Sequence, residues 1–360
     1  MSAKTLFKAI KKRLQTLRIR AGKMLLDRTP RPSEKPLSPE SIGGILFLRQ
    51  DGKIGDYIVS SFAFREIKKA APHIRIGVVC TEANRNLFER NPHIDAVHIV
   101  EAKSSRSYKQ VGRSIAGQYD VLIDPTAFVR NRDLVLIRSV NAPYNIGFDK
   151  AGYRIFNRQI AENLQHFSEI YRQALNICGF SNVDTHYELP PDAAAAAEAA
   201  AFLKQNGLKE YAALNFFGAA RSRQFNENRI RDILAAFTAK FPDTDFVLLT
   251  YPAATPMLEK LCREFNRCRV FAGTRTVWHS IELIRRANML LTPDTSTVHA
   301  AAAFGIPTVA LYSGDETNFR HWHPNSPAAA VIRYRDNINE IPPSVLEAAV
   351  SKQLAARKAV

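Results

Sequence analysis

Two aspartates stand at predicted sheet edges, where they can act on a bound substrate. Asp56 follows Gly55 at the start of an apolar-periodic helix, just after the apolar run 45–48. Asp294 stands at the start of a second predicted helix, after the apolar run 289–291. In parallel α/β sheets this position is the carboxyl edge, where ligands bind. Asp56 there can take a proton from an attacking hydroxyl. From the residues alone, it can equally serve only to complement the helix dipole.

The segment 288–314 is suited to binding an anion. It reads as strand, turn, small-residue helix, turn and strand, the pattern of a parallel α/β sheet. The free N–H groups and the dipole of a helix N-terminus attract phosphate groups. Thr295, Ser296 and His299 lie on this helix. Asp294 can also act only as an N-cap, and His299 can simply pack or face solvent.

A basic loop, residues 215–225, follows the first strand of the second half of the chain. Gly218, next to Ala219, allows a ligand to approach the backbone closely. Arg221 or Arg223 can neutralise a diphosphate through two parallel hydrogen bonds. Solvation is the other common fate of arginines in such a loop.

These segments resemble the motifs of glycosyltransferase family 9, the lipopolysaccharide heptosyltransferases. Pro293-Asp294-Thr295-Ser296-x-x-His299 resembles the donor signature, which is usually Asp-Thr-Gly-x-x-His, with Ser296 in place of Gly. Arg49-x-Asp51-x-x-Ile54-Gly55-Asp56 is similar to the opening motif, whose aspartate is the family's catalytic base. Arg223 and Phe225 match a basic and an aromatic position of the family's donor loop. The resemblance covers about residues 44 to 325.

The resemblance implies an inverting, metal-independent transfer of heptose from ADP-heptose to the Kdo–heptose inner core of lipopolysaccharide or lipooligosaccharide. Asp56 is then the catalytic base, and Arg49 and Lys53 lie on the acceptor side. No cofactor and no metal are expected, because arginines and a helix N-terminus can replace a cation. The implied donor-binding residues are Gly218, Ala219, Arg221, Arg223, Asp294, Thr295, Ser296 and His299.

Other functions stay open at this point. Members of the family often have an acidic residue that reads the nucleotide at the place of the loop 250–255, and this loop has none. The donor can therefore also be another nucleotide sugar, such as an N-acetylhexosamine on UDP or ADP. A sugar-nucleotide sensor without turnover has the same motifs. Nucleic-acid binding is not expected, because no zinc finger, RNP motif or aromatic-interleaved basic strand occurs.

The elements predict an α/β protein with two successive strand–helix arrays of similar size. We expect an N-terminal Rossmann-like acceptor domain at 42–188 and a C-terminal Rossmann-like domain for the nucleotide-sugar donor at 189–342, facing each other across a cleft. The segment 186–192, with its Pro-Pro pair, marks the boundary. The resemblance implies the GT-B architecture, with the last helix, 343–360, crossing back to the first domain.

Charge and the first 41 residues indicate an anionic partner. The 360-residue chain has 50 Lys and Arg against 34 Asp and Glu, a net charge of +16. Residues 4–26 form a predicted basic amphipathic helix, and the proline-rich stretch 29–41 a stiff linker. Such a helix can lie on an anionic membrane or pack on its own domain through the same apolar stripe. The resemblance implies an acidic lipid A–Kdo acceptor, which this charge fits, together with a peripheral location on the cytoplasmic face of the inner membrane.

Membrane-spanning and secretory segments are not expected. The longest apolar runs fall far short of the ~20 residues that cross a bilayer. The basic N-terminus lacks the apolar run and the cleavage site of a signal peptide. The four cysteines (Cys80, Cys178, Cys262 and Cys268) have no zinc-site spacing and are expected to be free thiols in a reducing compartment.

Overall fold

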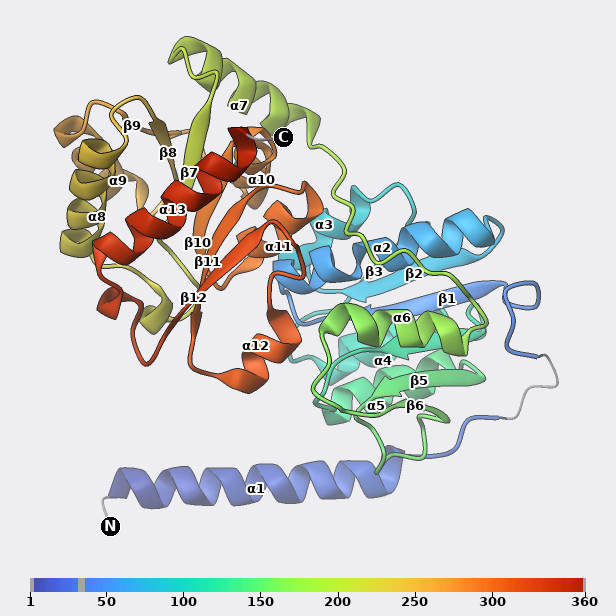
Figure 1. Ribbon diagram of the computed structural model, residues 1–360. Helices are drawn as coiled ribbons and strands as arrows, with labels where there is room; N and C mark the ends of the chain where they lie inside the picture. Colours follow the sequence, from blue (N-terminus) through green and yellow to red (C-terminus); the bar gives the residue numbers. More distant parts are fainter. Residues whose placement is uncertain (1–2, 32–35, 359–360) are drawn as a thin grey trace. The chain divides into compact units, whose positions relative to one another are not determined.

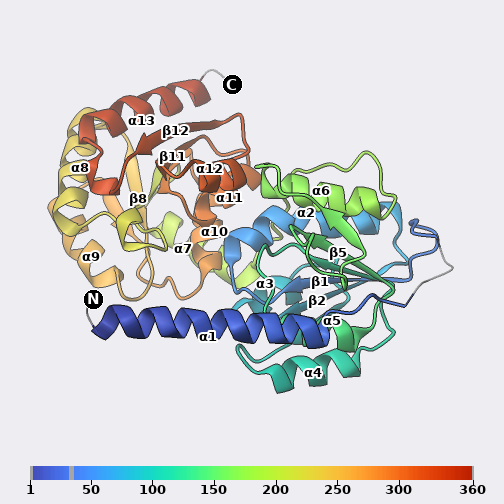
Figure 2. The same ribbon diagram turned by 90° about the horizontal axis from the view of Figure 1, so that it is seen from below.

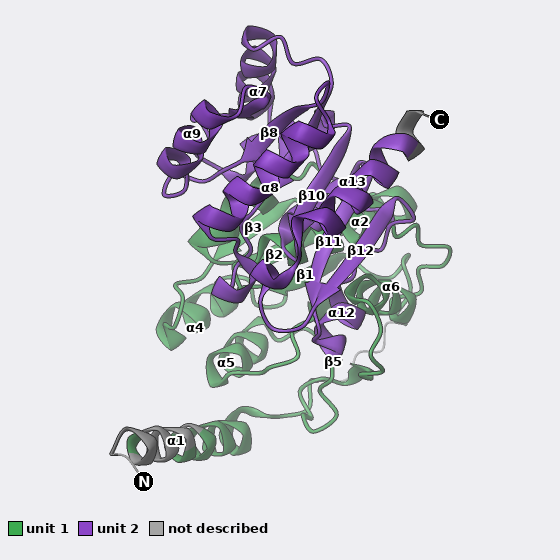
Figure 3. Cartoon of the chain, turned by 60° about the vertical axis from the view of Figure 1, so that its left-hand side comes forward, with its two compact units in different colours: residues 1–185 green, residues 186–360 purple. Residues whose placement is uncertain are grey.

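The chain folds as two compact units, residues 1–185 and 186–360, coloured separately in Figure 3. The computed structural model describes residues 3–31 and 36–358. Each unit is built around one six-stranded sheet with helices on its faces (Figure 1). The strands of both sheets pair in parallel. The division falls at the start of the segment 186–192.

The sheet of unit 1 has the strand order β3-β2-β1-β4-β5-β6. The strand order reverses between β1 and β4. In sheets of this kind, ligands bind at this point, beyond the carboxyl ends of the strands. The strands are β1 (Gly44–Arg49), β2 (Arg75–Cys80), β3 (Ala96–Ile99), β4 (Val121–Asp124), β5 (Tyr144–Phe148) and β6 (Arg158–Ile160). The helices are α1 (Ala3–Leu26), α2 (Ile54–Ala70), α3 (Arg85–Glu89), α4 (Ser105–Ser114), α5 (Asn131–Val140) and α6 (Phe167–Ile177), with a 3₁₀ turn at Glu82–Asn84.

The turn from β1 to α2 is set by local sequence. All six residues of β1 are buried, as expected of the apolar run in the centre of a parallel sheet. Gly52 has a φ of +72°, a left-handed conformation that glycine adopts without strain. Lys53 then caps α2, and Asp56 lies in the first helical turn. The predicted strand–turn–helix is confirmed.

The sheet of unit 2 repeats the same topology, with the order β12-β11-β10-β7-β8-β9. The strand order of this sheet therefore reverses between β7 and β10. The strands are β7 (Tyr211–Asn215), β8 (Asp245–Leu249), β9 (Cys268–Val270), β10 (Met289–Pro293), β11 (Thr308–Ser313) and β12 (Ala329–Tyr334). The helices are α7 (Ala193–Gln205), α8 (Glu227–Lys240), α9 (Thr255–Glu264), α10 (Val277–Arg286), α11 (Ser296–Ala303), α12 (Glu316–Trp322) and α13 (Pro343–Lys358), with 3₁₀ turns at Arg221–Arg223 and Ile338–Glu340.

Two local expectations in unit 2 were wrong. We expected the strand to end at residue 291, before Thr292-Pro293, and Asp294 to open the helix. Strand β10 instead continues through Pro293, and the Asp294 N–H donates to the Leu311 carbonyl at 2.9 Å. Thr295 is the N-cap of α11. Helix α12, which no sequence pattern indicates, begins where the Asp315 side chain caps it by accepting from the Asn318 N–H at 2.9 Å.

Helix α13 packs against α8, β10 and β11. Leu346 and Val350 on this helix are fully buried in the core of unit 2, which also contains Phe237 and Val309. The predicted return of this helix to the first domain stays a prediction.

Helix α1 is held against α5 within unit 1, and Figure 2 shows the two side by side. Gly22 is buried at this contact, where an added Cβ would overlap the Asn131 side chain. The Asn131 amide donates to the Arg18 carbonyl at 2.8 Å, and the Asp27 carboxylate accepts from the Ile155 N–H at 2.8 Å. The helix is therefore docked through its C-terminal half.

The docked side of α1 is not the apolar stripe that we predicted. Leu14, Leu17 and Met24, which belong to that stripe, have exposed fractions of 62%, 60% and 77%. Packing on the domain through the same stripe, one of the two expectations, is thus wrong for these residues. The side chains of Leu6 and Ile10, and the linker residues 32–35, lie outside the described residues.

Among the described residues, no helix combines the length and the apolar character that crossing a bilayer requires. The four cysteines are free, as expected. Burial raises the pKa of each thiol to about 12, so all four stay protonated near neutral pH.

Gly77 offers a direct test of the packing in unit 1. A Cβ at this position of β2 would overlap the hydroxyl of the buried Tyr119, which also bonds His98 Nε2 at 2.8 Å. We expect Gly77→Ala to lower the free energy of unfolding by ~1–3 kcal/mol, the usual cost of overpacking. Urea denaturation measures it. In a Tyr119→Leu background the same substitution should cost much less, and an equal cost in both backgrounds would contradict this packing.

Candidate functional site

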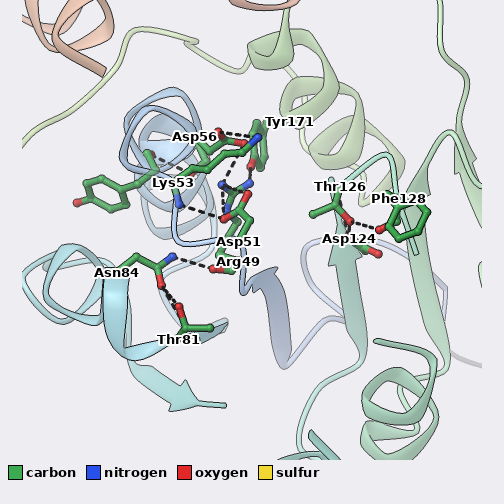
Figure 4. Close-up of polar contacts among 12 residues, drawn as sticks. Arg49, Asp51, Lys53, Asp56, Thr81, Asn84, Asp124, Thr126, Phe128 and Tyr171 are labelled. Atoms are coloured by element: carbon green, nitrogen blue, oxygen red, sulfur yellow. Dashed lines mark hydrogen bonds and ion pairs between the residues drawn. The ribbon is translucent and has the colours of Figure 1, made fainter. Parts of the chain in front are cut away.

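The first cluster of interacting polar residues in unit 1 is organised around Arg49, the last residue of β1 (Figure 4). Only 1% of Arg49 is exposed. Its Nη1 donates to the Tyr171 hydroxyl at 2.6 Å, and its Nη2 lies 3.1 Å from Asp51 Oδ2 and 3.2 Å from Asp56 Oδ1. One buried guanidinium thus holds two carboxylates and a phenol.

Asp56 has the environment of a proton acceptor. It is 7% exposed, in the first turn of α2. Burial raises its pKa above the ordinary aspartate value; Arg49 opposes this rise, and the neighbouring charge of Asp51 adds to it. A carboxylate with a raised pKa is a stronger base near neutral pH. Its Oδ1 is held by Arg49, which fixes the direction in which Oδ2 points.

Lys53 and Arg49, both predicted to contact an acceptor, have different surroundings. The Lys53 side chain is 64% exposed, with its Nζ 4.0 Å from Asp56 Oδ2. Arg49 is enclosed, and its clearest role is to position Asp56. Contact of either residue with an acceptor stays a prediction.

Neighbouring strand ends complete this edge of the sheet. The Asn84 amide, after β2, donates to the Arg49 carbonyl at 2.8 Å. After β4, the Thr126 hydroxyl donates to Asp124 Oδ1 at 2.7 Å, as drawn in Figure 4. The buried Lys150 ammonium lies 3.7 Å from Asp124 Oδ2, and burial lowers its pKa. Asp124 and Lys150 were missed by sequence reasoning, because no local pattern distinguishes them from surface charges.

The corresponding edge of unit 2 is organised around Asp294. Its Oδ2 accepts from Arg223 Nη1 at 2.5 Å and from the Asn318 amide at 2.8 Å. Burial raises the pKa of Asp294, while Arg223 opposes the rise. Arg223 and Asp294, which were both predicted to bind the sugar donor, thus come together from separate loops. Asn318 was missed because it lies on α12, which the sequence pattern did not reveal.

A hydrogen-bonded set behind Asp294 fixes the start of α11. The Asn215 amide, at the end of β7, donates to the Thr292 hydroxyl at 3.0 Å and the Thr297 hydroxyl at 3.2 Å. The two threonine hydroxyls are 2.6 Å apart. These hydrogen bonds connect β7 and β10 to the first turn of α11. The two strands lie on either side of the point where the strand order reverses.

A backbone hydrogen bond joins the two sides of the loop that carries Arg223. The Gly218 N–H donates to the Arg223 carbonyl at 2.9 Å. A Cβ on Gly218 would come within 2.6 Å of Arg223 Cβ and 2.8 Å of its carbonyl oxygen, so this close approach requires glycine. Ala219 and Arg221 are exposed at the tip of the loop.

The N-terminus of α11 and its histidine differ in accessibility. Thr295 caps the helix without a side-chain bond, and Thr295 and Ser296 are partly exposed. His299, in contrast, is 3% exposed, with its ring centroid 5.9 Å from that of Trp322 and 6.3 Å from that of Tyr187. Burial lowers its pKa to about 4, so the ring is neutral at pH 7. Packing, one of the two expected roles of His299, describes these contacts.

The family model for glycosyltransferase family 9 (heptosyltransferase) matches residues 109–342, more than half of the chain. The chain belongs to this family. It is accordingly a glycosyltransferase, and the predicted family and enzyme class are confirmed.

Individual relatives agree with this assignment. The chain is 21% identical over 308 residues, 80% of each protein, to a putative lipopolysaccharide heptosyltransferase 4 of Escherichia coli K12. A family 9 glycosyltransferase from Veillonella parvula has a TM-score of 0.72 at 19% identity, covering 87% of this chain and 97% of that one. The E. coli ADP-heptose lipopolysaccharide heptosyltransferase II has a TM-score of 0.67 at 17% identity, covering 88% and 99%. The predicted fold class, GT-B with two Rossmann-like domains, is confirmed.

Arg49 provides the test of the first cluster. We expect Arg49→Met to lower the free energy of unfolding at pH 7 by ~3–5 kcal/mol, because it leaves buried carboxylates without their cation. The loss should shrink as the pH falls towards the ordinary aspartate pKa, since protonated carboxyls are less costly to bury. Urea denaturation at pH 7 and pH 5 measures both effects.

Lys53→Ala is the matched control for this test, because it removes an exposed cation beside the same carboxylate. We expect it to cost less than ~1 kcal/mol. Similar losses for both variants, or a loss independent of pH, would contradict the role given to Arg49.

Proposed function

We propose that this glycosyltransferase moves heptose from ADP-heptose to the Kdo–heptose inner core of lipopolysaccharide or lipooligosaccharide, with inversion and without a metal. The observation that carries the proposal is the Asp56 carboxylate, buried at the carboxyl end of β1 and held there by Arg49. The names of two relatives, a putative lipopolysaccharide heptosyltransferase and an ADP-heptose heptosyltransferase, support the choice of sugar and pathway.

The proposed reaction is a single displacement. Asp56 takes the proton of the acceptor hydroxyl while the hydroxyl oxygen forms a bond to the anomeric carbon of the donor. The bond from that carbon to the diphosphate breaks on the opposite face, and ADP leaves with the electron pair. The proton stays on Asp56 until solvent removes it.

The residues around Asp294 are proposed to hold the departing diphosphate. Arg223 uses Nη1 for Asp294, while an arginine has five N–H donors. Its side chain is 24% exposed, so the remaining donors can reach a phosphate. The start of α11, where Thr295 and Ser296 are partly exposed, adds the positive end of a helix dipole. The same loop also contains Gly218, Ala219 and Arg221, which are proposed to bind the donor as well. Together these groups supply the charge compensation for which other enzymes use a cation.

Basic residues fit the proposed acceptor. The net charge of +16 attracts a glycolipid with Kdo carboxylates and phosphates. Lys53, exposed beside Asp56, is proposed to contact one of these anions. Incubation of the purified protein with ADP-heptose and truncated lipid A–Kdo acceptors, read by mass spectrometry, tests the transfer. A mass increase of another sugar from another donor would assign a different specificity.

Asp56→Asn tests the base. We expect kcat to fall by roughly 10²–10⁴-fold, the usual contribution of a general base, while the affinity for ADP-heptose is unchanged. In the wild type, the rate should fall as the pH drops through the pKa of Asp56. That limb should lie above the ordinary aspartate value, because burial raises this pKa. Turnover and calorimetric donor binding are the measurements.

The control is Asp149→Asn, which removes an exposed carboxylate from the same unit at a left-handed position that asparagine tolerates. Its activity should equal that of the wild type. Retained turnover in Asp56→Asn would remove this residue from the role of base.

Helix α1 is proposed to lie on the cytoplasmic face of the inner membrane. Phe7, Leu14, Leu17, Met24 and Leu25 are all more than half exposed. At 3.6 residues per turn they fall within about 100° of the helix circumference. Arg13 and Arg20 border one edge of this apolar arc, as basic residues do in helices that bind anionic membrane surfaces.

Replacing both Leu14 and Leu17 by Ser tests the membrane contact. Each leucine contributes up to ~1.5–3 kcal/mol when fully buried, so we expect binding to anionic vesicles to weaken at least tenfold. Vesicle co-sedimentation measures it. Val345→Ser, which changes an exposed apolar residue of unit 2, should leave binding unchanged. Equal binding of wild type and the double variant would rule out this contact.

A further inference from the structure

A small cavity between α1 and two loops of unit 1 is strongly basic. Its volume is about 130 Å³, enough for a phosphate group with water, whose share of liquid volume is about 30 Å³. It is separate from the Asp56 cluster, which contributes no lining residue. Four of the eight lining residues are cationic and none is acidic: Arg18, Ile19, Lys103, Ser105, Phe128, Arg130, Asn131 and Arg132.

The positive charges of this cavity are poorly compensated. In the part of the chain that the structure describes, Lys103 and Arg18 have no acidic partner. Arg130 has Asp133, but its Nη1 is 4.0 Å from Oδ2, and that carboxylate is already engaged by the Arg130 N–H at 2.8 Å and the Gln50 amide at 3.2 Å. Arg132 Nε is buried without a hydrogen-bond partner. Gathering such groups raises their mutual repulsion unless an anion joins them.

The backbone around the cavity favours an anion as well. Lys103 and Ser105 stand at the N-terminus of the ten-residue helix α4, whose dipole adds partial positive charge. The Ser104 side chain caps this helix by accepting from the Ser107 N–H at 3.2 Å. Lys103 has a φ of 73°, a left-handed conformation that few non-glycine residues other than Asn and Asp adopt.

Helix α1 closes the cavity and brings it near the exposed apolar arc. The Asn131 amide binds the Arg18 carbonyl, which fixes the helix to this wall. Arg18 lies on the helix between the docked residue Gly22 and the exposed Leu14 and Leu17. Its position is therefore suited to a ligand that approaches along the same side as an apolar surface.

We propose that this cavity binds a phosphate monoester group through Lys103, Arg18, Arg130 and Arg132. A phosphate offers three acceptor oxygens and about two negative charges, which match several cationic donors arranged around a small space. The group can belong to a lipid in the membrane or to a free phosphate in solution. The site does not involve Asp56 or Asp294, so it stands independently of the proposed transfer reaction.

Titration of the full chain with inorganic phosphate tests the site. Lys103→Gly removes the amine and suits the left-handed backbone, so the fold is kept. We expect it to weaken phosphate binding about tenfold or more, the effect of losing one charge-assisted hydrogen bond. Arg106→Ala is the matched control: it removes one exposed cation from the first turn of the same helix but does not line the cavity. Its phosphate affinity should be unchanged.

Vesicles distinguish the two sources of the phosphate. One set contains phosphatidic acid, which has a phosphate monoester, and the other phosphatidylglycerol, a diester. A preference for phosphatidic acid that Lys103→Gly abolishes and Arg106→Ala retains identifies a lipid. Lost phosphate binding in Lys103→Gly without any such preference identifies a free phosphate. Absence of phosphate binding in the wild type, or equal losses in Lys103→Gly and Arg106→Ala, would overturn the proposal.

Discussion

The contacts of the buried Arg49 guanidinium are the interactions on which the polar cluster of the first unit depends. The guanidinium lies at the end of the central strand and satisfies Asp51, Asp56 and Tyr171 together. A buried carboxylate is costly without a cation, and a buried cation is equally costly without carboxylates. Neither charge can be removed alone. This mutual dependence keeps the Asp56 carboxylate in one orientation at a position that water reaches poorly.

The second unit also pairs a buried carboxylate with an arginine, but this arginine is more accessible. Asp294 is also buried and paired with an arginine, but Arg223 lies on a loop and is partly exposed. A partly exposed arginine retains donors for a ligand, whereas an enclosed one serves only its neighbours. Since both sheets have the same strand order, the difference arises from the loops and not from the sheets. The first unit therefore encloses its arginine beside a buried carboxylate, and the second leaves its arginine partly exposed.

Sequence reasoning located the positions that depend on local pattern. The β1–α2 turn has its glycine and its helical periodicity close together, so the place of Asp56 at the sheet edge followed directly. The partner of Arg49 did not, because Tyr171 is 122 residues away on α6. Asn318 was hidden for another reason: α12 is a short helix of seven residues with little apolar periodicity, and its start depends on the capping by Asp315. Long-range partners and short capped helices leave little trace in a single sequence.

The way in which α1 is attached has a consequence for its evolution. Side chains of the domain grip the helix by its main-chain carbonyl groups: Asn131 binds that of Arg18, Arg138 that of Leu25, and Arg154 that of Asp27 just beyond the helix. A carbonyl is present whatever the side chain is. Substitutions on the outward face of α1 can therefore accumulate without breaking these three hydrogen bonds.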